Sequence, residues 1–464
     1  MAPGPAPDAA ATEPAGPCDA CKQFDFSKVP PSIRALPRPG LFPLPPTGPG
    51  YYSALDFLTG AYRDGPPQYP YPPFALSPLS FYDADWRFVD KPGYDPDFLE
   101  QLKRVRVGDN WLFATGGQAW VRYSNEYNSR LTESNNVYSL VRVRPYVDLW
   151  YQDCFRVFVE GIFADNLWHD IPPLGTDVDR GDFQNLFVEA KVAEVGDRPV
   201  FVRAGRQEVS LGSLRLVGTP DWGNTRRTWD GVRAFRVGEN WDVDLFWLQP
   251  VFPNATELNS ADHQQNFAGS WVTYRPRKGT FVDAYYLMLD NDNRVTQTGI
   301  VRAPFTIHTI GGRYASDFDD RFLWETEGAI QLGEVNSAPV VAGMYSGGLG
   351  YHAKEVAWNP TFWAYYNYTS GDNDPNAGTY HTFNQLFPFI HYYMGWVDAV
   401  GRQNNLDLNL RLYLYPAKWV TVWLQYHHFW LAEPKDALYG IAGNAYRATR
   451  PGWRGRTWAK RRKS

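Results

Sequence analysis

The sequence predicts an all-β fold, a transmembrane antiparallel β-barrel that follows a Pro-rich, irregular N-terminal segment. Three observations predict it: abundant aromatic residues in a polar chain, recurring polar–apolar alternation, and connections that alternate between short and long. Aromatic residues make up 16% of the 464 residues, yet the mean hydropathy is −0.44. Strands with one wet face and one lipid-facing face produce this mixture. No stretch approaches the roughly 18 consecutive apolar residues that a membrane helix needs, so a membrane crossing would use strands.

Alternation with a period of two begins near Trp111 and recurs along the chain. In Asn405–Leu412 the odd positions are Asn, Asp, Asn and Arg, and the even positions are all Leu. A helix cannot place this pattern on one face, so each such segment is expected to be a strand. Pro145 interrupts one of them, and we expect a β-bulge there because proline cannot donate to the ladder. The fifteen predicted strands are approximately Leu112–Glu126, Tyr138–Tyr151, Phe155–Ala164, Leu186–Ala193, Val200–Val209, Thr228–Val237, Trp241–Phe252, Gln265–Tyr274, Phe281–Leu289, Phe305–Ala315, Phe322–Leu332, Val340–Tyr351, Trp358–Thr369, Asn405–Tyr415 and Trp419–Trp430.

The connections between these strands alternate in length. Every second one is tight, as at Gln152–Asp153 and Pro416–Ala417. Most of the others are long and polar, as in Leu211–Arg226 and Gly371–Arg402. A barrel with short periplasmic turns and long external loops produces this alternation. The loops of a sandwich or propeller need not sort in this way, so the connections favour a barrel.

Composition divides the chain into four segments and limits its partners. We expect a Pro-rich disordered leader at residues 1–50, an irregular aromatic and Pro-rich segment at 51–105, the barrel at 106–432, and an external loop with an aberrant basic tail at 433–464. The net charge of −5 gives no global indication of nucleic-acid binding. The start of the chain lacks the basic and apolar regions of a secretory signal peptide, which an exported protein needs.

Several blocks of sequence resemble the alginate-export family of outer-membrane barrels. The blocks are Gly205-Arg206-Gln207-Glu208, Arg215-Leu216-Val217-Gly218 with Asp221-Trp222, Trp229-Asp230-Gly231-Val232-Arg233, Ser370-Gly371-Asp372, and Thr382-Phe383-Asn384-Gln385-Leu386-Phe387-Pro388. The resemblance covers roughly Asn110 to Ala432. It implies a monomeric 18-stranded barrel in the bacterial outer membrane, with an electropositive lumen that passes a polyuronate. Outer-membrane lipid and periplasmic secretion proteins are the further partners that the resemblance implies.

The end of the chain departs from the family pattern. About fifteen strands is an odd number, whereas single-chain bacterial barrels have an even number. Residues Arg447–Ser464 are rich in Arg and Lys and show no alternation. We interpret this as a frameshift or truncation that removes roughly three strands, because an open sheet edge in lipid leaves backbone groups unpaired. A natural basic tail is the alternative.

A transport lumen needs fixed charges that replace part of the hydration of the permeant. For a carboxylated polymer these charges should be arginines, whose planar guanidinium matches a carboxylate. In a purely structural interpretation, the lumen charges neutralise each other in pairs. In a functional interpretation, surplus positive charge at a constriction selects anions. Arg142 and Arg144, two residues apart on one face, are the strongest candidates. The expected lumen and substrate path contains Arg122, Glu126, Arg142, Arg144, Asp148, Arg156, Glu160, Glu189, Arg206, Asp230, Arg233, Arg313, Asp407 and Arg411.

Other chemistry has little support in the sequence. No catalytic constellation or cofactor motif is visible, so we expect neither an enzyme nor a cofactor. Asp372, Asp374 and Asn376 have the alternating oxygen spacing of a calcium loop, but no bidentate Glu follows, and a solvated turn is favoured over a metal site. Four tryptophans are expected mainly in girdles at the membrane interfaces: Trp358, Trp363, Trp423 and Trp430.

Three functions remain open from the sequence. The first is passive export of an anionic, alginate-like exopolysaccharide. The second is a general anion-preferring porin for small solutes, which loop length cannot distinguish from the first. The third, from another class, is a soluble β-rich carbohydrate-binding protein.

Overall fold

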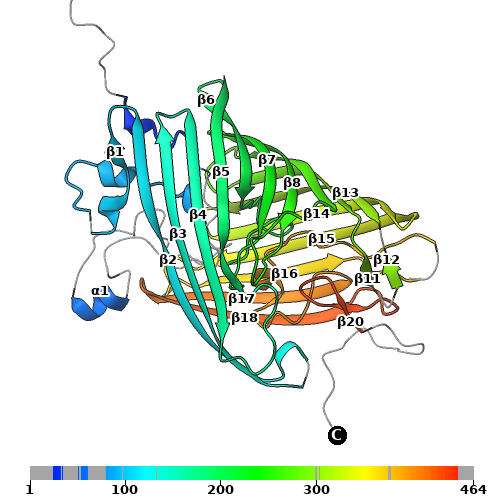
Figure 1. Cartoon of the computed structure of the whole chain (residues 1–464). Helices are drawn as coiled ribbons and strands as arrows, with labels where there is room; N and C mark the ends of the chain where they lie inside the picture. The colour runs from blue at the N-terminus through cyan, green and yellow to red at the C-terminus, as the bar shows by residue number, and fades with distance from the viewer. Residues whose placement is uncertain are drawn as a thin grey trace, which may run out of the picture.

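The main feature of the protein is a 16-stranded antiparallel sheet that is strongly curved (Figure 1). The structure is a computed structural model that describes residues 24–32, 34, 51, 54–60, 80–96, 98–131, 133–297, 300–302, 304–374 and 378–447. The strands of the sheet are β1 (Val105–Val107), β2 (Trp111–Glu126), β3 (Asn136–Tyr151), β4 (Phe155–Leu167), β5 (Asp179–Val195), β6 (Arg198–Gln207), β7 (Thr228–Val237), β8 (Trp241–Val251), β9 (Gln265–Tyr274), β10 (Phe281–Asn291), β13 (Phe305–Phe318), β14 (Phe322–Val335), β15 (Ala338–His352), β16 (Thr361–Thr369), β17 (Asn405–Ala417) and β18 (Val420–Leu431).

Small elements lie outside the sheet. Two short hairpins pair β11 (Val295–Gln297) with β12 (Ile300–Arg302) and β19 (Leu438–Tyr439) with β20 (Ala445–Arg447). The helices are α1 (Ala54–Thr59) and α2 (Ile390–Met394), with 3-10 turns η2 (Phe26–Lys28), η3 (Phe81–Asp83), η4 (Arg87–Asp90), η5 (Glu100–Leu102) and η6 (Ser129–Leu131). Within the described ranges, no helix is long and apolar enough to cross a membrane.

The fifteen predicted strands are confirmed, one for each strand from β2 to β18 of the sheet. Each strand pairs with the previous and the next strand of the sheet along the chain, so tight turns and long loops alike connect antiparallel neighbours. The alternation of short and long connections is also present, with two exceptions. The link predicted to be tight at Ala353–Glu355 extends over residues 353–360 between β15 and β16. Asn336 and Ser337, both with positive φ, form a tight turn between β14 and β15 on the side of the long loops.

The predicted bulge at Pro145 is wrong. Pro145 pairs with Gly117 of β2 in unbroken register, and the register of β3 with β4 is the same before and after it. Glycines lie on both neighbouring strands at this point, since Cγ of Pro145 is 3.6 Å from where a Cβ of Gly161 would be. The ring therefore fits without an extra residue. Register shifts occur instead between β4 and β5, between β5 and β6, and between β17 and β18.

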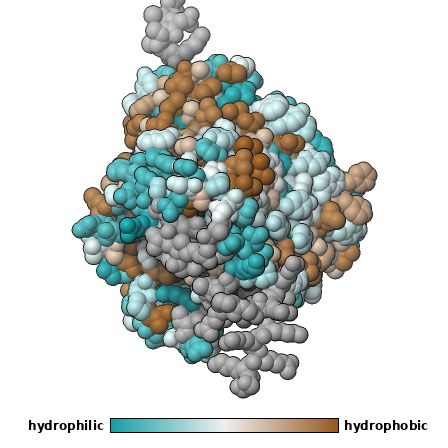
Figure 2. Space-filling view, turned by 90° about the vertical axis from the view of Figure 1, so that its right-hand side faces the viewer, coloured by the Kyte–Doolittle hydropathy of each residue, from teal (hydrophilic) through white to brown (hydrophobic). Residues whose placement is uncertain are grey.

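The two faces of the sheet differ as the alternation predicts. On β3, Arg142 and Arg144 are buried on the inner face, whereas Val143 and Val147 are exposed on the outer face. β13 shows the same contrast between buried Arg313 and exposed Ile310. Figure 2 shows brown apolar residues gathered along the upper edge of the molecule, beside teal polar residues nearer its middle. An apolar outer face and a polar inner face are typical of a barrel wall in lipid.

Two long connections turn back into the interior. The first inner loop (residues 208–227) follows β6, and the second inner loop (residues 378–404) precedes β17. They pair with each other in parallel at Val217 and Phe387. Leu216 and Val217 are completely buried against inward tryptophans of the wall, including Trp229 and Trp271. The apolar core therefore lies inside the curved sheet, between the wall and its own loops.

The sheet has two free edges in the described chain. β1 pairs with only the first three residues of β2, and no pairing joins β18 to β1 or to β2. The first long strand, β2, and the fifteenth, β18, run in the same direction because all the pairs between them are antiparallel. Aromatic side chains of the inner loops lie between these two edge strands. Trp222 contacts Arg122 of β2, and Trp396 contacts both Trp222 and Trp423 of β18.

Candidate functional site

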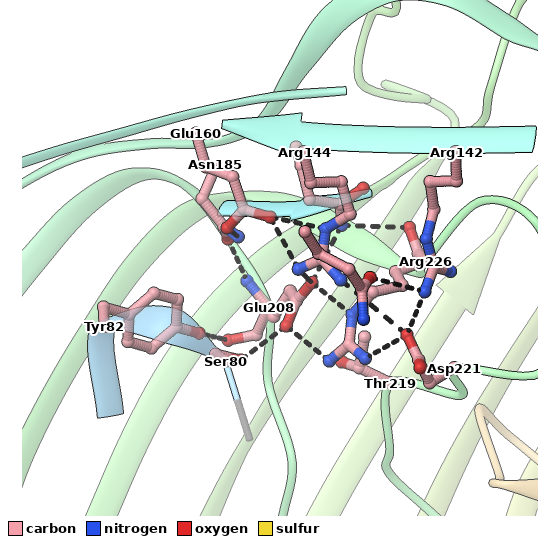
Figure 3. Close-up of polar contacts among 12 residues, drawn as sticks. Ser80, Tyr82, Arg142, Arg144, Glu160, Asn185, Glu208, Thr219, Asp221 and Arg226 are labelled. Carbon is pink, nitrogen blue, oxygen red and sulfur yellow. Dashed lines mark hydrogen bonds and ion pairs between the residues drawn. The ribbon is translucent and has the colours of Figure 1, made fainter. Parts of the chain in front are cut away.

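A network of three arginines and three carboxylates occupies the inner face of β3 and β4 (Figure 3). Nε of Arg144 donates to Glu160 over 2.6 Å, and Nη2 of Arg142 donates to Asp221 over 2.9 Å. Arg226 of the first inner loop joins the two parts, because it contacts both Glu208 and Asp221 at 2.7 Å. Three positive and three negative groups cancel, so this network contributes no surplus charge.

Glu208 is the carboxylate on which this network converges. Besides Arg226 it accepts from Gln184 over 3.0 Å, and its backbone N–H donates to Asn185 over 2.8 Å. Burial by itself would raise the pKa of Glu208, but the charge and hydrogen bonds of Arg226, with the charge of Arg144, lower that pKa to about 2. The side chain is therefore ionised throughout the neutral range.

Most other arginines of the predicted path also have a carboxylate partner. Their shortest contacts are Arg156–Asp148 at 2.7 Å, Arg206–Asp230 at 2.8 Å, Arg233–Asp244 at 2.6 Å and Arg313–Asp283 at 2.6 Å. Glu189 pairs with Arg203 at 2.6 Å, Asp407 contacts His427 at 2.9 Å, and Glu126 accepts from Tyr138 over 2.6 Å. Glu189 and the four arginines thus form neutralising pairs on the inner face, whereas Glu126 and Asp407 have a tyrosine and a histidine as partners.

Two predicted arginines are held by aromatic rings instead. The guanidinium of Arg122 lies 4.0 Å from the ring centroid of Trp222, and it donates to the carbonyl oxygen of Trp222 over 2.6 Å. Arg411 lies 4.5 Å from the centroid of Tyr392 and 4.9 Å from that of Tyr365. Within the described chain, neither forms a salt bridge with a carboxylate. Aromatic faces attract a guanidinium without neutralising its charge.

Sequence reasoning missed two further arginines of this kind, because both lie in loops without periodicity. Arg402 of the second inner loop is 2% exposed, and its Nε and Nη2 find no hydrogen-bond acceptor in the described residues. Arg227, at the end of the first inner loop, donates to the carbonyl oxygens of Gly218 and Phe387 over 2.9 and 2.6 Å. Burial lowers the pKa of each to about 10, so both stay charged at neutral pH.

The inner loops also supply partners that the predicted path did not contain. Arg215 crosses the interior to contact Glu325 at 3.1 Å and Glu327 at 2.7 Å on β14. Glu208, Arg215 and Asp221 belong to the sequence blocks that carry the family resemblance. The family resemblance therefore pointed to these residues in the sequence. It gave them no role, because polar–apolar alternation does not extend into loops.

Two minor expectations concern the calcium-like sequence and the tryptophans. In the calcium-like sequence, the amide of Asp374 donates to Asp372 over 3.0 Å and that of Asp372 donates to Asp436 over 2.9 Å, while Asn376 lies outside the described residues. Within the described part of the chain, no cluster of three or more metal-ligating side chains occurs. The girdle prediction is wrong for Trp363 and Trp423, which face inward. Trp363 is 1% exposed against Tyr365, and Trp423 packs on Tyr392 and Trp396.

The curved antiparallel sheet, its apolar outer face and its charged inner face define the class of outer-membrane β-barrel channels. A sequence model described as alginate export matches residues 112–461. The chain therefore belongs to the alginate export family. The barrel was predicted to end at Ala432, but the family match continues to residue 461.

Solved structures with a similar fold have low sequence identity to this chain. OccK11 (OpdR) of Pseudomonas aeruginosa is 12% identical with a TM-score of 0.45, over 72% of this chain and 84% of that one. OccAB1 of Acinetobacter baumannii is 11% identical with a TM-score of 0.45, over 69% and 80%. A BenF-like porin of Pseudomonas fluorescens Pf-5 is 8% identical with a TM-score of 0.38, over 69% and 93%. No curated protein sequence matches the chain.

Proposed function

We propose that this protein is a channel of the bacterial outer membrane that passively exports an anionic, alginate-like exopolysaccharide. The observation that carries the proposal is the set of interior arginines without a carboxylate partner among the described residues: Arg122, Arg227, Arg402 and Arg411. Charges buried without a counter-ion are costly, and a carboxylate that reaches them lowers that cost. Guanidinium groups in a lumen whose charge no carboxylate compensates favour anions over cations, and Arg122 and Arg402 also have donors without an acceptor among the described residues.

The unpaired arginines replace Arg142 and Arg144 as the main candidates for selectivity. Arg142 and Arg144 already share Glu160, Glu208 and Asp221, so their charges are compensated within the wall. Arg402 and Arg411 both lie close to the ring of Tyr393, with guanidinium-to-centroid distances of 5.4 and 5.7 Å. Two positive groups beside one ring are a suitable place to attract a carboxylated sugar.

Bilayer recordings under a salt gradient test the anion preference. We expect the reversal potential of the wild-type channel to indicate preference for chloride. The Arg402→Gln/Arg411→Gln variant should lose much of this preference, because both groups are unpaired. The control is Arg321→Gln, which removes an exposed arginine that pairs with Glu355 at a short turn. A cation-preferring wild type, or a double variant that equals the control, would contradict the proposal.

Secretion of polymer distinguishes export from the second candidate, a general anion-preferring porin for small solutes. Both candidates predict anion-selective current, but only export predicts that cells without the protein fail to release an acidic polysaccharide. Restoring the wild-type protein should restore release, and restoring Arg402→Gln/Arg411→Gln should restore less. Normal release without the protein would favour the general porin.

A further inference from the structure

Two parts of the N-terminal segment pack against the inner face of the sheet. Phe26 and Val29 pack on Leu112, Trp150 and Phe201, which are inward residues close to the short turns. Arg34 forms two hydrogen bonds with Asp244 near the start of β8, at 2.7 and 3.0 Å. In Figure 1 the blue segment lies beside the ends of β1 to β4 at the upper left.

The second such part is the N-terminal turn, residues 80–83, which includes η3. Phe81 stacks on Tyr146 at 5.0 Å, and Tyr82 meets Phe158 and Phe187 edge to face at 5.3 and 5.1 Å. Tyr82 is 4% exposed and belongs to the same buried cluster as these wall residues. Two aromatic side chains of the turn thus fill a pocket on the inner face of β3, β4 and β5.

Three wall arginines surround the same turn. The guanidinium of Arg144 lies 4.6 Å from the centroid of Phe81, and that of Arg203 lies 4.4 Å from the centroid of Tyr82. Arg156 donates to the carbonyl oxygen of Tyr82 over 2.8 Å. Arg144 and Arg156 are members of the predicted substrate path, so the turn covers positions that a permeant anion would otherwise reach.

Two hydroxyl groups of the turn also form hydrogen bonds with the first inner loop. Ser80 donates to a carboxylate oxygen of Glu208 over 2.5 Å, and Tyr82 donates to the carbonyl oxygen of Glu208 over 2.6 Å (Figure 3). The turn therefore binds at the point where the first inner loop meets the wall, and it joins the two.

We propose that the turn Ser80–Asp83 is a tethered plug that closes the short-turn half of the lumen and leaves its arginine–aromatic pocket when the channel conducts. This inference rests on the proposed function, since a plug requires a conducting lumen. When the turn leaves, each of these wall arginines keeps a carboxylate partner: Arg144 keeps Glu160, Arg156 keeps Asp148, and Arg203 keeps Glu189. The turn gives the wall two rings, two hydroxyls and one carbonyl oxygen, and the negative charge of its Asp83 also acts on Arg156.

Single-channel recordings of the full chain test the plug. The Phe81→Ala/Tyr82→Ala variant should conduct several-fold more current, or stay open for a several-fold larger fraction of time, than the wild type. The milder Ser80→Ala/Tyr82→Phe variant keeps both rings and removes both hydroxyl donors to Glu208, so it should fold and open more often. Phe98→Ala is the control, because Phe98 belongs to the same segment but is 79% exposed.

Heat-modifiable migration on a gel establishes that each variant is folded before it is recorded. If the folded variants keep the conductance and open fraction of the wild type and of Phe98→Ala, the plug is overturned. Reversal potentials recorded in the same experiment separate the two proposals. Larger currents without anion preference would support the plug and contradict anion export. Anion-selective currents that no plug variant changes would support anion export and contradict the plug.

Discussion

Arg142 and Arg411 both project from the inner faces of strands, but different groups hold their guanidiniums. Arg142 contacts Asp221, whereas Arg411 lies between the rings of Tyr392 and Tyr365. Only the charge of Arg411 has no carboxylate partner among the described residues. Polar–apolar alternation indicated that both arginines face inward, and it could not indicate their partners, because Asp221 and Tyr392 lie in loops that return from distant positions in the sequence.

The buried network around Glu208 supports a prediction about stability. Glu208→Gln leaves Arg226 with one carboxylate partner instead of two, and it removes a neighbour of Arg144. Breaking a buried ion pair on one side costs about 3–5 kcal/mol, so the free energy of unfolding should fall by an amount of this order. Urea unfolding of the refolded protein in detergent measures it. Glu355→Gln, at the exposed pair with Arg321, should cause no measurable loss, and an equal loss in both variants would contradict the reasoning.

The pH dependence of stability should also report Glu208. Its pKa falls from 4.5 to about 2 in the folded protein, so its ionised form is favoured by folding. The stabilisation is complete above pH 4.5 and is lost as the pH falls from 4.5 towards 2. The free energy of unfolding, measured from pH 4.5 to pH 2, should decline in the wild type. It should decline less in Glu208→Gln. An identical decline in both proteins would show that other carboxylates cause it.

At the scale of elements, the strands could be predicted from the sequence and the inner loops could not. A strand with one face in lipid and one face in the lumen must alternate, so β17 is recognisable from its leucines alone. The first inner loop has no such constraint, because most of its residues are buried among other parts of the protein and none of its faces must meet lipid. The turn Ser80–Asp83 was hidden for the same reason, since its contacts are made with strands that follow much later in the chain.

The pairing of β6 with β7 supports a prediction about two glycines. Gly205 and Gly231 lie opposite each other, with φ of +122° and +155°. A Cβ on Gly205 would lie 2.4 Å from the carbonyl oxygen of Leu186. Gly205→Ala should therefore destabilise the protein by roughly 1–3 kcal/mol and lower the folded fraction on a heat-modifiability gel. Gly175→Ala, in a loop with open space around the position, is the control. Equal folded fractions for the two variants would show that this strand adapts.

At the scale of the whole molecule, side chains enter the interior from both ends, and the wall has two free edges among the described strands. The inner loops enter from the side of the long connections, and the N-terminal segment covers the side of the short turns. Phe57 of α1 stacks on Trp419 at 4.9 Å, beside the start of β18. Backbone groups left unpaired in lipid cost several kcal/mol each, so segments that lie along β2 and β18 matter for the stability of the whole wall.

The outer face should show a depth-dependent cost for charge if the wall stands in a bilayer. Ile310 and Phe318 both point outward from β13 and are 50% and 69% exposed, but Ile310 lies mid-strand and Phe318 at its short-turn end. An arginine at the bilayer midplane costs about 2–4 kcal/mol and one near the interface about 0–1 kcal/mol. Ile310→Arg should therefore lower the free energy of unfolding in lipid vesicles much more than Phe318→Arg does. If the outer face of β13 were in water, an arginine would be tolerated about equally at both positions. Equal and small costs for the two variants would therefore mean that β13 does not cross a membrane.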